Sequence, residues 1–248
     1  MLPIWNIGPL AIQIPGLILL AGIWIGLSRI EWFARHRKMR VEVISGLVFY
    51  TLLAGILGAR LGYIAQNIGV FIQRPIDVLS LSPQMLDTSG GIIAMLLTGF
   101  VYGQRKGMAL WPTLDVLTPG LAVLIMALAG MNLSSGNGFG VPARLPWSIY
   151  LFEDWRHPTQ IYDLILGFAI WRVIESKPHD VSLPDGSRFL TLVALAAAAH
   201  IAVDAFRAEN VMIGLGGVRS TQLIAFSILL VAVEMIRRRK TSQKEAEP

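Results

Sequence analysis

The chain has 248 residues, of which 54% are hydrophobic and only 15% are charged. A soluble domain of this length carries roughly a quarter charged residues, so much of the surface faces something other than water. The absence of cysteine excludes a disulfide framework, a thiolate metal site and a cysteine nucleophile within the chain. The net charge of +5 would suit nucleic acid, but the placement of the basic residues favours membrane orientation signals, so we expect no nucleic-acid partner.

About seven apolar segments approach the roughly 20 residues that a helix needs to cross a bilayer. They are Leu10–Leu27, Val43–Ile64, Gly90–Tyr102, Leu110–Met131, Ile161–Ile174, Phe189–Phe206 and Thr221–Ile236. No basic segment precedes the first and no small-residue cleavage site follows it, so we expect it to stay in the mature protein. The pattern predicts an all-α, polytopic membrane protein with a single transmembrane domain at 1–240 and a disordered cytoplasmic tail at 241–248.

Most of the 21 Lys and Arg residues follow the first, third, fifth and seventh apolar segments. These residues are Arg29, Arg35, Arg37, Lys38, Arg40, Arg105, Lys106, Arg172, Lys177, Arg188, Arg237, Arg238, Arg239, Lys240 and Lys244. The others are Arg60, Arg74, Arg144, Arg156, Arg207 and Arg219. By the positive-inside rule, the N-terminus lies outside and the C-terminus lies in the cytoplasm.

Two outer segments differ from ordinary loops. Residues 66–89 are mostly apolar but contain Pro75 and Pro83, which favours a position in the membrane interface. Residues 132–158 are rich in Gly, Asn and Pro, which predicts an irregular loop. Its aromatic residues, among them Trp147 and Trp155, are typical of a belt at headgroup level.

Ionisable residues inside apolar segments usually mark a functional site or a paired charge. His200, Asp204 and Arg207 are spaced by four and three residues, so one helix would present all three on one face. Such a group could form a bonded chain or present an arginine fork to a phosphate. Alternatively, Asp204 and Arg207 only pair with each other near a helix end, and His200 is an interhelical hydrogen-bonding group.

Arg60, Asp115 and Asp163 are the other ionisable residues at membrane depth. Glycines flank Arg60 on both sides and permit close helix packing, so a structural ion pair is an alternative to ligand binding there. Asp115 lies toward the cytoplasmic side, which favours a structural role.

The loop around Ser135–Gly138 could turn several backbone N–H groups toward one anion. Arg60, Arg156 with His157, and Arg207 are predicted to lie on the same side of the membrane. This grouping leads to the hypothesis of a site for an anionic lipid headgroup.

Other chemistry lacks a sequence signal. The chain has no P-loop, no Gly-x-Ser-x-Gly elbow, no His-Glu-x-x-His motif and no metal-ligand cluster among its four histidines. We therefore expect no cofactor.

Several segments resemble the bacterial prolipoprotein diacylglyceryl transferases. Arg156–Asp163 is similar to that family's Arg-His-Pro-Ser-Gln-Leu-Tyr-Glu and is the most specific part of the resemblance. Gly58–Tyr63 looks like its Gly-Gly-Arg-Ile-Gly-Tyr, and Ile201–Arg207 resembles its Ile-Ile-Val-Glu-Phe-Phe-Arg. Further matching positions, which extend the resemblance over nearly the whole chain, are Asp115, Pro119, Asn132, Gly136, Gly140 and Gln222.

The resemblance implies transfer of the diacylglyceryl group of phosphatidylglycerol to the thiol of a lipobox cysteine at the outer face of the bacterial cytoplasmic (inner) membrane. The implied partners are phosphatidylglycerol, the preprolipoprotein signal peptide and the lipid bilayer. The expected catalytic residues are His200, Asp204 and Arg207. The expected substrate-binding residues are Arg60, Asn132, Gly136, Gly140, Arg156, His157, Gln160, Tyr162 and Asp163.

The chain departs from the family at several polar positions. Ser89 stands where the family has a histidine that is a proposed base, and Ala129 stands where it has a headgroup arginine. His200 occupies a second arginine position, and Ala196 replaces a tyrosine before it. Either the site is rebuilt, with His200 as base or phosphate partner, or catalysis is lost and the protein binds anionic lipid or lipoprotein precursor. A small-solute carrier is disfavoured, because the polar residues gather near the outer ends of the helices.

Overall fold

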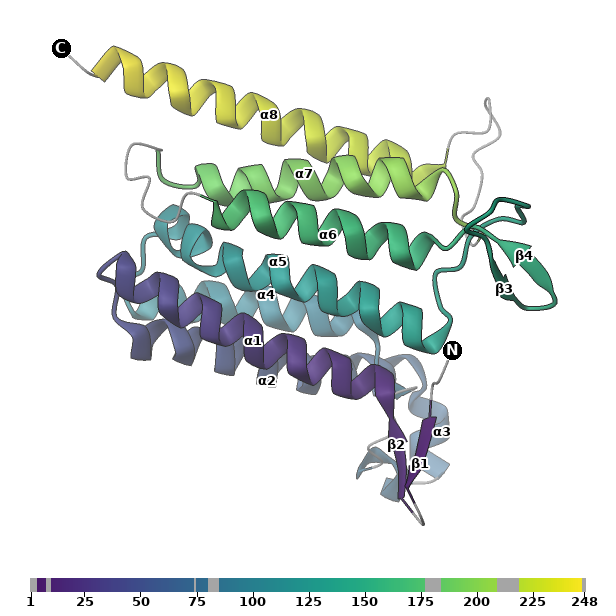
Figure 1. Ribbon diagram of the computed structural model, residues 1–248. Helices are drawn as coiled ribbons and strands as arrows, with labels where there is room; N and C mark the ends of the chain where they lie inside the picture. Colours follow the sequence, from purple (N-terminus) through teal and green to yellow (C-terminus); the bar gives the residue numbers. More distant parts are fainter. Residues whose placement is uncertain are drawn as a thin grey trace. The chain divides into compact units, whose positions relative to one another are not determined.

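The computed structural model describes residues 4–7, 10–73, 75–79, 85–176, 184–208 and 219–246 (Figure 1). The chain divides into two compact units, residues 1–37 with 114–248 and residues 38–113, and each is described by itself. The first unit contains β1 (Ile4–Ile7), β2 (Leu10–Gln13), α1 (Ile14–His36), most of α5 (Leu110–Ser135), β3 (Ile149–Leu151), β4 (Asp154–Arg156), α6 (Thr159–Glu175), α7 (Ser187–Asp204) and α8 (Ser220–Ala246). The second contains α2 (Val41–Gln66), α3 (Ile68–Gln73), the 3₁₀-helix η1 (Pro75–Leu79) and α4 (Thr88–Arg105).

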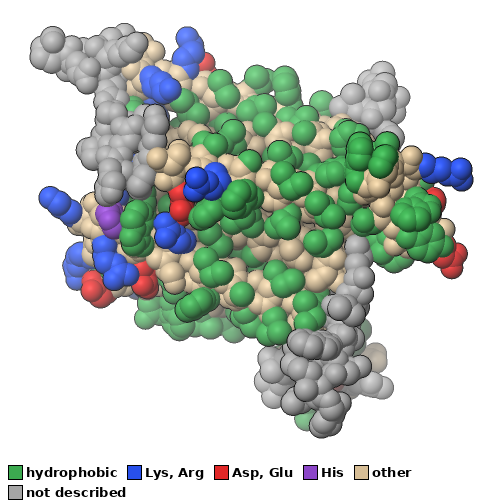
Figure 2. Space-filling view, viewed as in Figure 1, with side chains coloured by type: hydrophobic (Ala, Val, Ile, Leu, Met, Phe, Trp, Pro, Cys, Tyr) green, Lys and Arg blue, Asp and Glu red, His purple; other side chains and the backbone are tan. Residues whose placement is uncertain are grey.

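Five helices have the length and apolar composition to cross a membrane: α1, α2, α5, α7 and residues Ser220–Ser242 of α8. Many large apolar side chains on these helices are exposed, such as Trp24 at 72% and Ile224 at 61%. Figure 2 shows hydrophobic side chains covering the middle of the helices and charged ones gathering toward their ends. These features confirm the predicted all-helical, polytopic membrane fold, whereas the number of spans, the single-domain organisation and the orientation stay predictions.

Each predicted apolar segment overlaps a helix, but several helix ends differ from the prediction. Helix α5 continues to Ser135, inside the loop predicted at 132–158, and α7 ends at Asp204, before Phe206. Leu10–Gln13 pairs with Ile4–Ile7 as an antiparallel hairpin, so α1 begins at Ile14 and not at residue 10. Pro15 lies in the first turn of α1, where a missing N–H removes no helical bond. At the other end, α8 continues through Ala246, so residues 241–246 are helical where the sequence predicts a disordered tail.

The predicted interfacial segment 66–89 contains the short helices α3 and η1. Arg74 and Pro83 lie outside the described residues, as does Lys177 elsewhere in the chain.

In the second unit, α2 packs along α4 through small residues. Asp87 caps α4 by accepting a hydrogen bond from the Gly90 N–H at 2.5 Å. This bond, with help from Gln66, holds the pKa of Asp87 below its usual value. A Cβ added at Gly90 would lie 2.7 Å from the Gly58 carbonyl oxygen and 3.1 Å from the Gly62 Cα. Only glycine therefore permits this approach of the two helix backbones.

A methyl group at this crossing tests the packing. We expect Gly90→Ala to lower the stability by about 1–3 kcal/mol, because the neighbouring atoms are backbone and cannot rotate away. Gly103→Ala is the matched control on the same helix, since a Cβ there meets nothing within 4 Å. It should be neutral or stabilising by up to about 1 kcal/mol. Thermal unfolding in mild detergent compares the two, and equal melting temperatures would contradict the packing argument.

In the first unit, α6 and α7 lie side by side and α8 packs along α7 (Figure 1). The buried side chains between α5, α6 and α7 form a core cluster of Ala122, Ile170, Ile174 and Leu192. Ile170 of this cluster also lines the candidate site described below.

Asp115 of α5 caps the start of α7. Its carboxylate accepts hydrogen bonds from the backbone N–H of Gly186 at 2.7 Å and of Phe189 at 2.9 Å. Gly186 is the residue before the helix and has no side chain with which to cap it. The 2% exposed Asp115 supplies the missing acceptor from another helix, as the predicted structural role requires.

Removal of the Asp115 carboxylate should destabilise the start of α7 and lower the free energy of unfolding. Asp115→Ala leaves two buried N–H groups without a partner, and we expect it to cost about 2 kcal/mol or more. Asp115→Asn keeps one acceptor oxygen and should cost less. Thermal unfolding should therefore rank the wild type above Asp115→Asn and Asp115→Ala last. The cap would be refuted if Asp115→Ala melted with the wild type.

Candidate functional site

The loop between α5 and α6 is attached to the start of α6 by hydrogen bonds to its backbone carbonyl groups. Gly136 and Gly138 have φ values of +84° and +66°, which only glycine adopts readily. The carbonyl oxygen of Gly138 accepts a hydrogen bond from Thr159 Oγ1 at 2.6 Å, and that of Asn137 accepts one from Gln160 Nε2 at 3.0 Å. These contacts fix the loop to the start of α6. The predicted cluster of N–H groups around one anion stays a prediction.

The β3–β4 hairpin, the loop segment Gly140–Pro142 and the chain after α7 are joined by antiparallel pairing. Strand β4 pairs with β3 and also forms a bridge from Arg156 to Pro142. The same loop segment forms a second bridge, from Gly140 to Arg207. A Cβ at Gly140 would lie 2.5 Å from the His157 carbonyl oxygen and 2.9 Å from that of Phe206. Gly140 therefore permits the approach that brings the chain after α7 onto this loop.

Arg207 lies outside the helix on which the sequence places it. Helix α7 ends at Asp204, and the backbone bonds from Val141 N–H to the Phe206 carbonyl and from Ala208 N–H to the Phe139 carbonyl draw the chain onto the loop. The prediction that Arg207 stacks above His200 and Asp204 on one helix face is therefore wrong.

The Arg207 guanidinium forms an ion pair with Asp163 near the start of α6. Its Nη2 donates to Asp163 Oδ2, and the two side chains are 22% and 20% exposed. The Nε of Arg207 is buried and has no hydrogen-bond partner among the described residues. One guanidinium donor is therefore paired with Asp163, whereas the buried Nε is unpaired among the described residues.

A cavity of about 250 Å³ lies among α5, α6 and α7 and includes this ion pair. Its polar residues are Asn132, Asp163, His200 and Arg207, all of which were predicted as site residues. Its other lining residues are Ile125, Leu128, Ala129, Leu166, Gly167, Ile170, Ala196 and Ala199. The cavity far exceeds the roughly 10–15 Å³ that one water molecule needs.

Asp204 does not line this cavity. It is fully buried, and its Oδ2 accepts a hydrogen bond from Thr221 Oγ1 at 2.6 Å. Its backbone carbonyl accepts a hydrogen bond from Arg219 Nη1. These bonds join the end of α7 to the start of α8, which supports a positioning role for Asp204 and not contact with a substrate.

Most of the Arg156–Asp163 segment organises the loop. Arg156 donates to the carbonyl oxygens of Leu151 and Gly140 at 3.1 and 3.4 Å. The hydroxyl of Tyr162 lies 3.2 Å from His157 Nδ1 and accepts a hydrogen bond from Trp147 Nε1 at 2.9 Å. Asp163 is the member of the segment that lines the cavity.

In the second unit, Arg60 binds backbone carbonyl groups. Its guanidinium donates to the carbonyl oxygens of Asp77 at 2.5 Å, Met85 at 3.1 Å and Val78 at 3.2 Å. It therefore holds η1 and the chain before α4, and its predicted role at a headgroup stays a prediction. Ser89, at the family's histidine position, lies in the first turn of α4.

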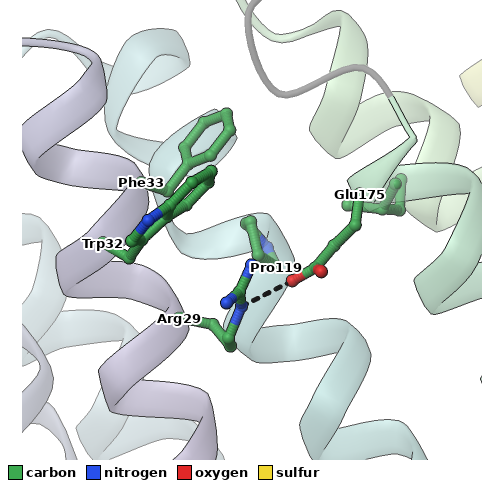
Figure 3. Close-up of a pocket in the computed structure, with 6 residues that line it drawn as sticks. Arg29, Trp32, Phe33, Pro119 and Glu175 are labelled. Atoms are coloured by element: carbon green, nitrogen blue, oxygen red, sulfur yellow. Dashed lines mark hydrogen bonds and ion pairs between the residues drawn. The ribbon is translucent and has the colours of Figure 1, made fainter.

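A second, much smaller cavity of about 20 Å³ lies beside Pro119, where α1, α5 and α6 meet (Figure 3). Arg29 Nε donates to Glu175 Oε1 at 2.6 Å across it, and the guanidinium carbon lies 4.9 Å from the centre of the Trp32 ring. It has room for about one water molecule. The ion pair fastens α1 to α6, a role that the sequence did not indicate. Within the described residues, no group of three or more His, Cys, Asp or Glu could hold a metal ion.

The fold and the site define a helical membrane protein with a cavity between helices, whose lining is partly polar and partly apolar and includes an arginine. The family model described as prolipoprotein diacylglyceryl transferase matches residues 3–238. The chain belongs to this family.

Three relatives illustrate the similarity, and each is named phosphatidylglycerol–prolipoprotein diacylglyceryl transferase. The protein of Synechococcus sp. strain CC9902 is 25% identical over 243 residues, covering 90% of this chain and 87% of the relative. That of Thermus thermophilus is 27% identical over 275 residues, covering 94% and 96%. That of Brucella canis is 26% identical over 230 residues, covering 85% and 80%.

The Arg207–Asp163 pair can be tested apart from activity. Asp163→Ala leaves a part-buried guanidinium without its carboxylate, and we expect a loss of stability on the order of 2 kcal/mol. The double variant Asp163→Ala with Arg207→Met should recover part of this loss, because no uncompensated charge remains. A double-mutant cycle from thermal unfolding measures the coupling energy. Strictly additive effects would show that the two residues do not interact.

Proposed function

We propose that this protein transfers the diacylglyceryl group of phosphatidylglycerol to the thiol of a lipobox cysteine in a preprolipoprotein. The observation that carries the proposal is the cavity where Arg207 lies among Asp163, His200 and Asn132. The family match over residues 3–238 and the names of the relatives support the same reaction.

In this reaction the thiol sulfur forms a bond to the terminal glyceryl carbon, and the bond from that carbon to the phosphate oxygen breaks. The leaving glycerol phosphate gains one negative charge, and the thiol loses its proton. No atom changes its oxidation state overall, so the transfer requires no redox cofactor. The site must therefore supply a cation for the phosphate and an acceptor for the proton.

The cavity residues can meet both requirements. The Arg207 guanidinium would bind the phosphate through its remaining donors, and Asp163 would hold that guanidinium in place. His200 would accept the thiol proton or donate to the phosphate, since imidazole does either near neutral pH. Asp204 would act indirectly, by fixing the end of α7 through Thr221.

The charge pattern supports an arrangement with the N-terminus outside and the C-terminus in the cytoplasm of a bacterial inner membrane. In that orientation, the end of α5, the start of α6 and the end of α7 lie at the outer face. The polar residues of the cavity come from these three helix ends and the chain after α7. A signal peptide held in the bilayer by its apolar segment would then present its cysteine at the level of Arg207.

The replacements at Ala129 and Ala196 are the reason for a second candidate, a catalytically silent relative that binds anionic lipid or lipoprotein precursor. It shares the cavity and the ion pair but lacks the transfer step. A single assay separates the two candidates.

Purified protein in micelles that contain phosphatidylglycerol is given a lipobox peptide, and the mass of the peptide is followed. We expect a mass increase of one diacylglyceryl group. Arg207→Ala should slow the transfer by about 10²-fold or more, because a donor to the developing phosphate charge is lost. Arg144→Ala, which removes an exposed arginine of the loop between α5 and α6, should leave the rate unchanged.

Size-exclusion profiles of the two variants show whether each is folded. A peptide that keeps its mass with wild-type protein, while a relative from Thermus thermophilus modifies it in parallel, favours the silent candidate. Full activity of Arg207→Ala would remove the arginine from the mechanism.

A further inference from the structure

The cavity between α5, α6 and α7 changes character along its length. Its lining residues on α5 run from Asn132 back to Ile125, and those on α6 run from Asp163 to Ile170. At 1.5 Å per residue, each run covers about 10 Å. Since α5 and α6 run in opposite directions, both runs begin at the same polar end (Figure 1).

The polar end and the apolar end are built from different residues. Asn132, Asp163 and Arg207 lie where α5 ends, α6 begins and α7 has ended. Away from this end the lining residues are aliphatic or glycine except for His200, which follows Ala199 on α7, and Ile170 also belongs to the buried core cluster. A ligand that fits both ends has an anionic head and an apolar chain.

Small residues create the apolar part of the cavity. Ala196 and Ala199 line it from α7, Ala129 from α5 and Gly167 from α6. A Cβ at Gly167 would lie 3.1 Å from Met126 Cγ, so α6 approaches α5 closely there. The width of the cavity beside α7 therefore depends on Ala196 and Ala199, because a larger side chain at either position would fill part of the cavity.

An acyl chain suits this space better than a soluble ligand does. Apart from His200, the side chains of this part offer no hydrogen-bond partner to a sugar or a peptide group, and burial of such a group without a partner is unfavourable. An acyl chain that moves from the bilayer into this cavity exchanges one apolar environment for another. Whether it binds therefore depends on how well its shape matches the cavity. Arg207 would meet the phosphate of the same lipid at the polar end.

We propose that this cavity seats one acyl chain of the phosphatidylglycerol substrate and that Ala196 and Ala199, with Ala129, determine the chain length that it accepts. The proposal rests on the proposed function and adds a specificity determinant to it.

The test is a competition between two donors that differ only in chain length. Dilauroyl- and dipalmitoyl-phosphatidylglycerol are supplied in equal amounts in phosphatidylcholine nanodiscs, and the two lipidated peptides are quantified by mass. Ala196→Leu should shift the product ratio toward the dilauroyl peptide by about 10-fold or more, because the added side chain fills the apolar part. The matched control is Ala198→Leu, which makes the same change at an exposed position of the same helix.

Each outcome has a separate meaning. An unchanged ratio in folded, active Ala196→Leu overturns the chain-length proposal and leaves the transferase function intact. If the wild-type protein transfers neither lipid, the proposed function fails, and the chain-length proposal is judged by thermal stabilisation with each lipid. Wild-type protein should then be stabilised by both lipids, and Ala196→Leu should lose stabilisation mainly by the dipalmitoyl form. Equal stabilisation of Ala196→Leu and Ala198→Leu by that lipid overturns it.

Discussion

The ion pair between Arg207 and Asp163 joins the segments on which the candidate site depends. Asp163 lies near the start of α6, and the backbone of Arg207 is bridged to Gly140 in the loop that leads into that helix. A part-buried charge pair is tolerated only where its geometry compensates for the lost hydration, so it specifies one arrangement of these segments. With α6, the loop and the end of α7 fixed together, the cavity has a defined polar end. The Arg207 side chain then has a fixed place at this end.

The helices could be predicted from hydropathy because each must cover about the same thickness of apolar solvent. That α7 ends before Arg207 could not be predicted from hydropathy. The chain after Asp204 forms backbone hydrogen bonds to Phe139 and Val141, which lie more than sixty residues earlier in the sequence. Spacing by three and four residues describes a helix only while the helix continues. Asp115 was correctly predicted to be structural, but its partners at Gly186 and Phe189 follow from the tertiary fold.

The segment Arg156–Asp163 shows how a specific motif divides between structure and site. Arg156 and Gln160 bond to carbonyl groups of the loop, and Tyr162 joins His157 to Trp147. Only Asp163 of this segment reaches the cavity. A motif of this kind signals a precise backbone path as strongly as it signals chemistry, and sequence alone does not separate the two contributions. Arg60 makes the same point in the second unit, where its donors are bonded to backbone carbonyl groups.

The alanines that replace polar residues of the family also shape the cavity. In the sequence, Ala129 replaces a headgroup arginine of the family and Ala196 replaces a tyrosine, whereas in the structure both line the cavity. Their small size leaves Arg207 as the lining guanidinium among the described residues, and Asp163 already balances its charge. A phosphate bound there must therefore compete with Asp163 or gain further donors. Asn132 and His200 line the same cavity, and in the proposed function His200 would donate to the phosphate from the position where the family has an arginine.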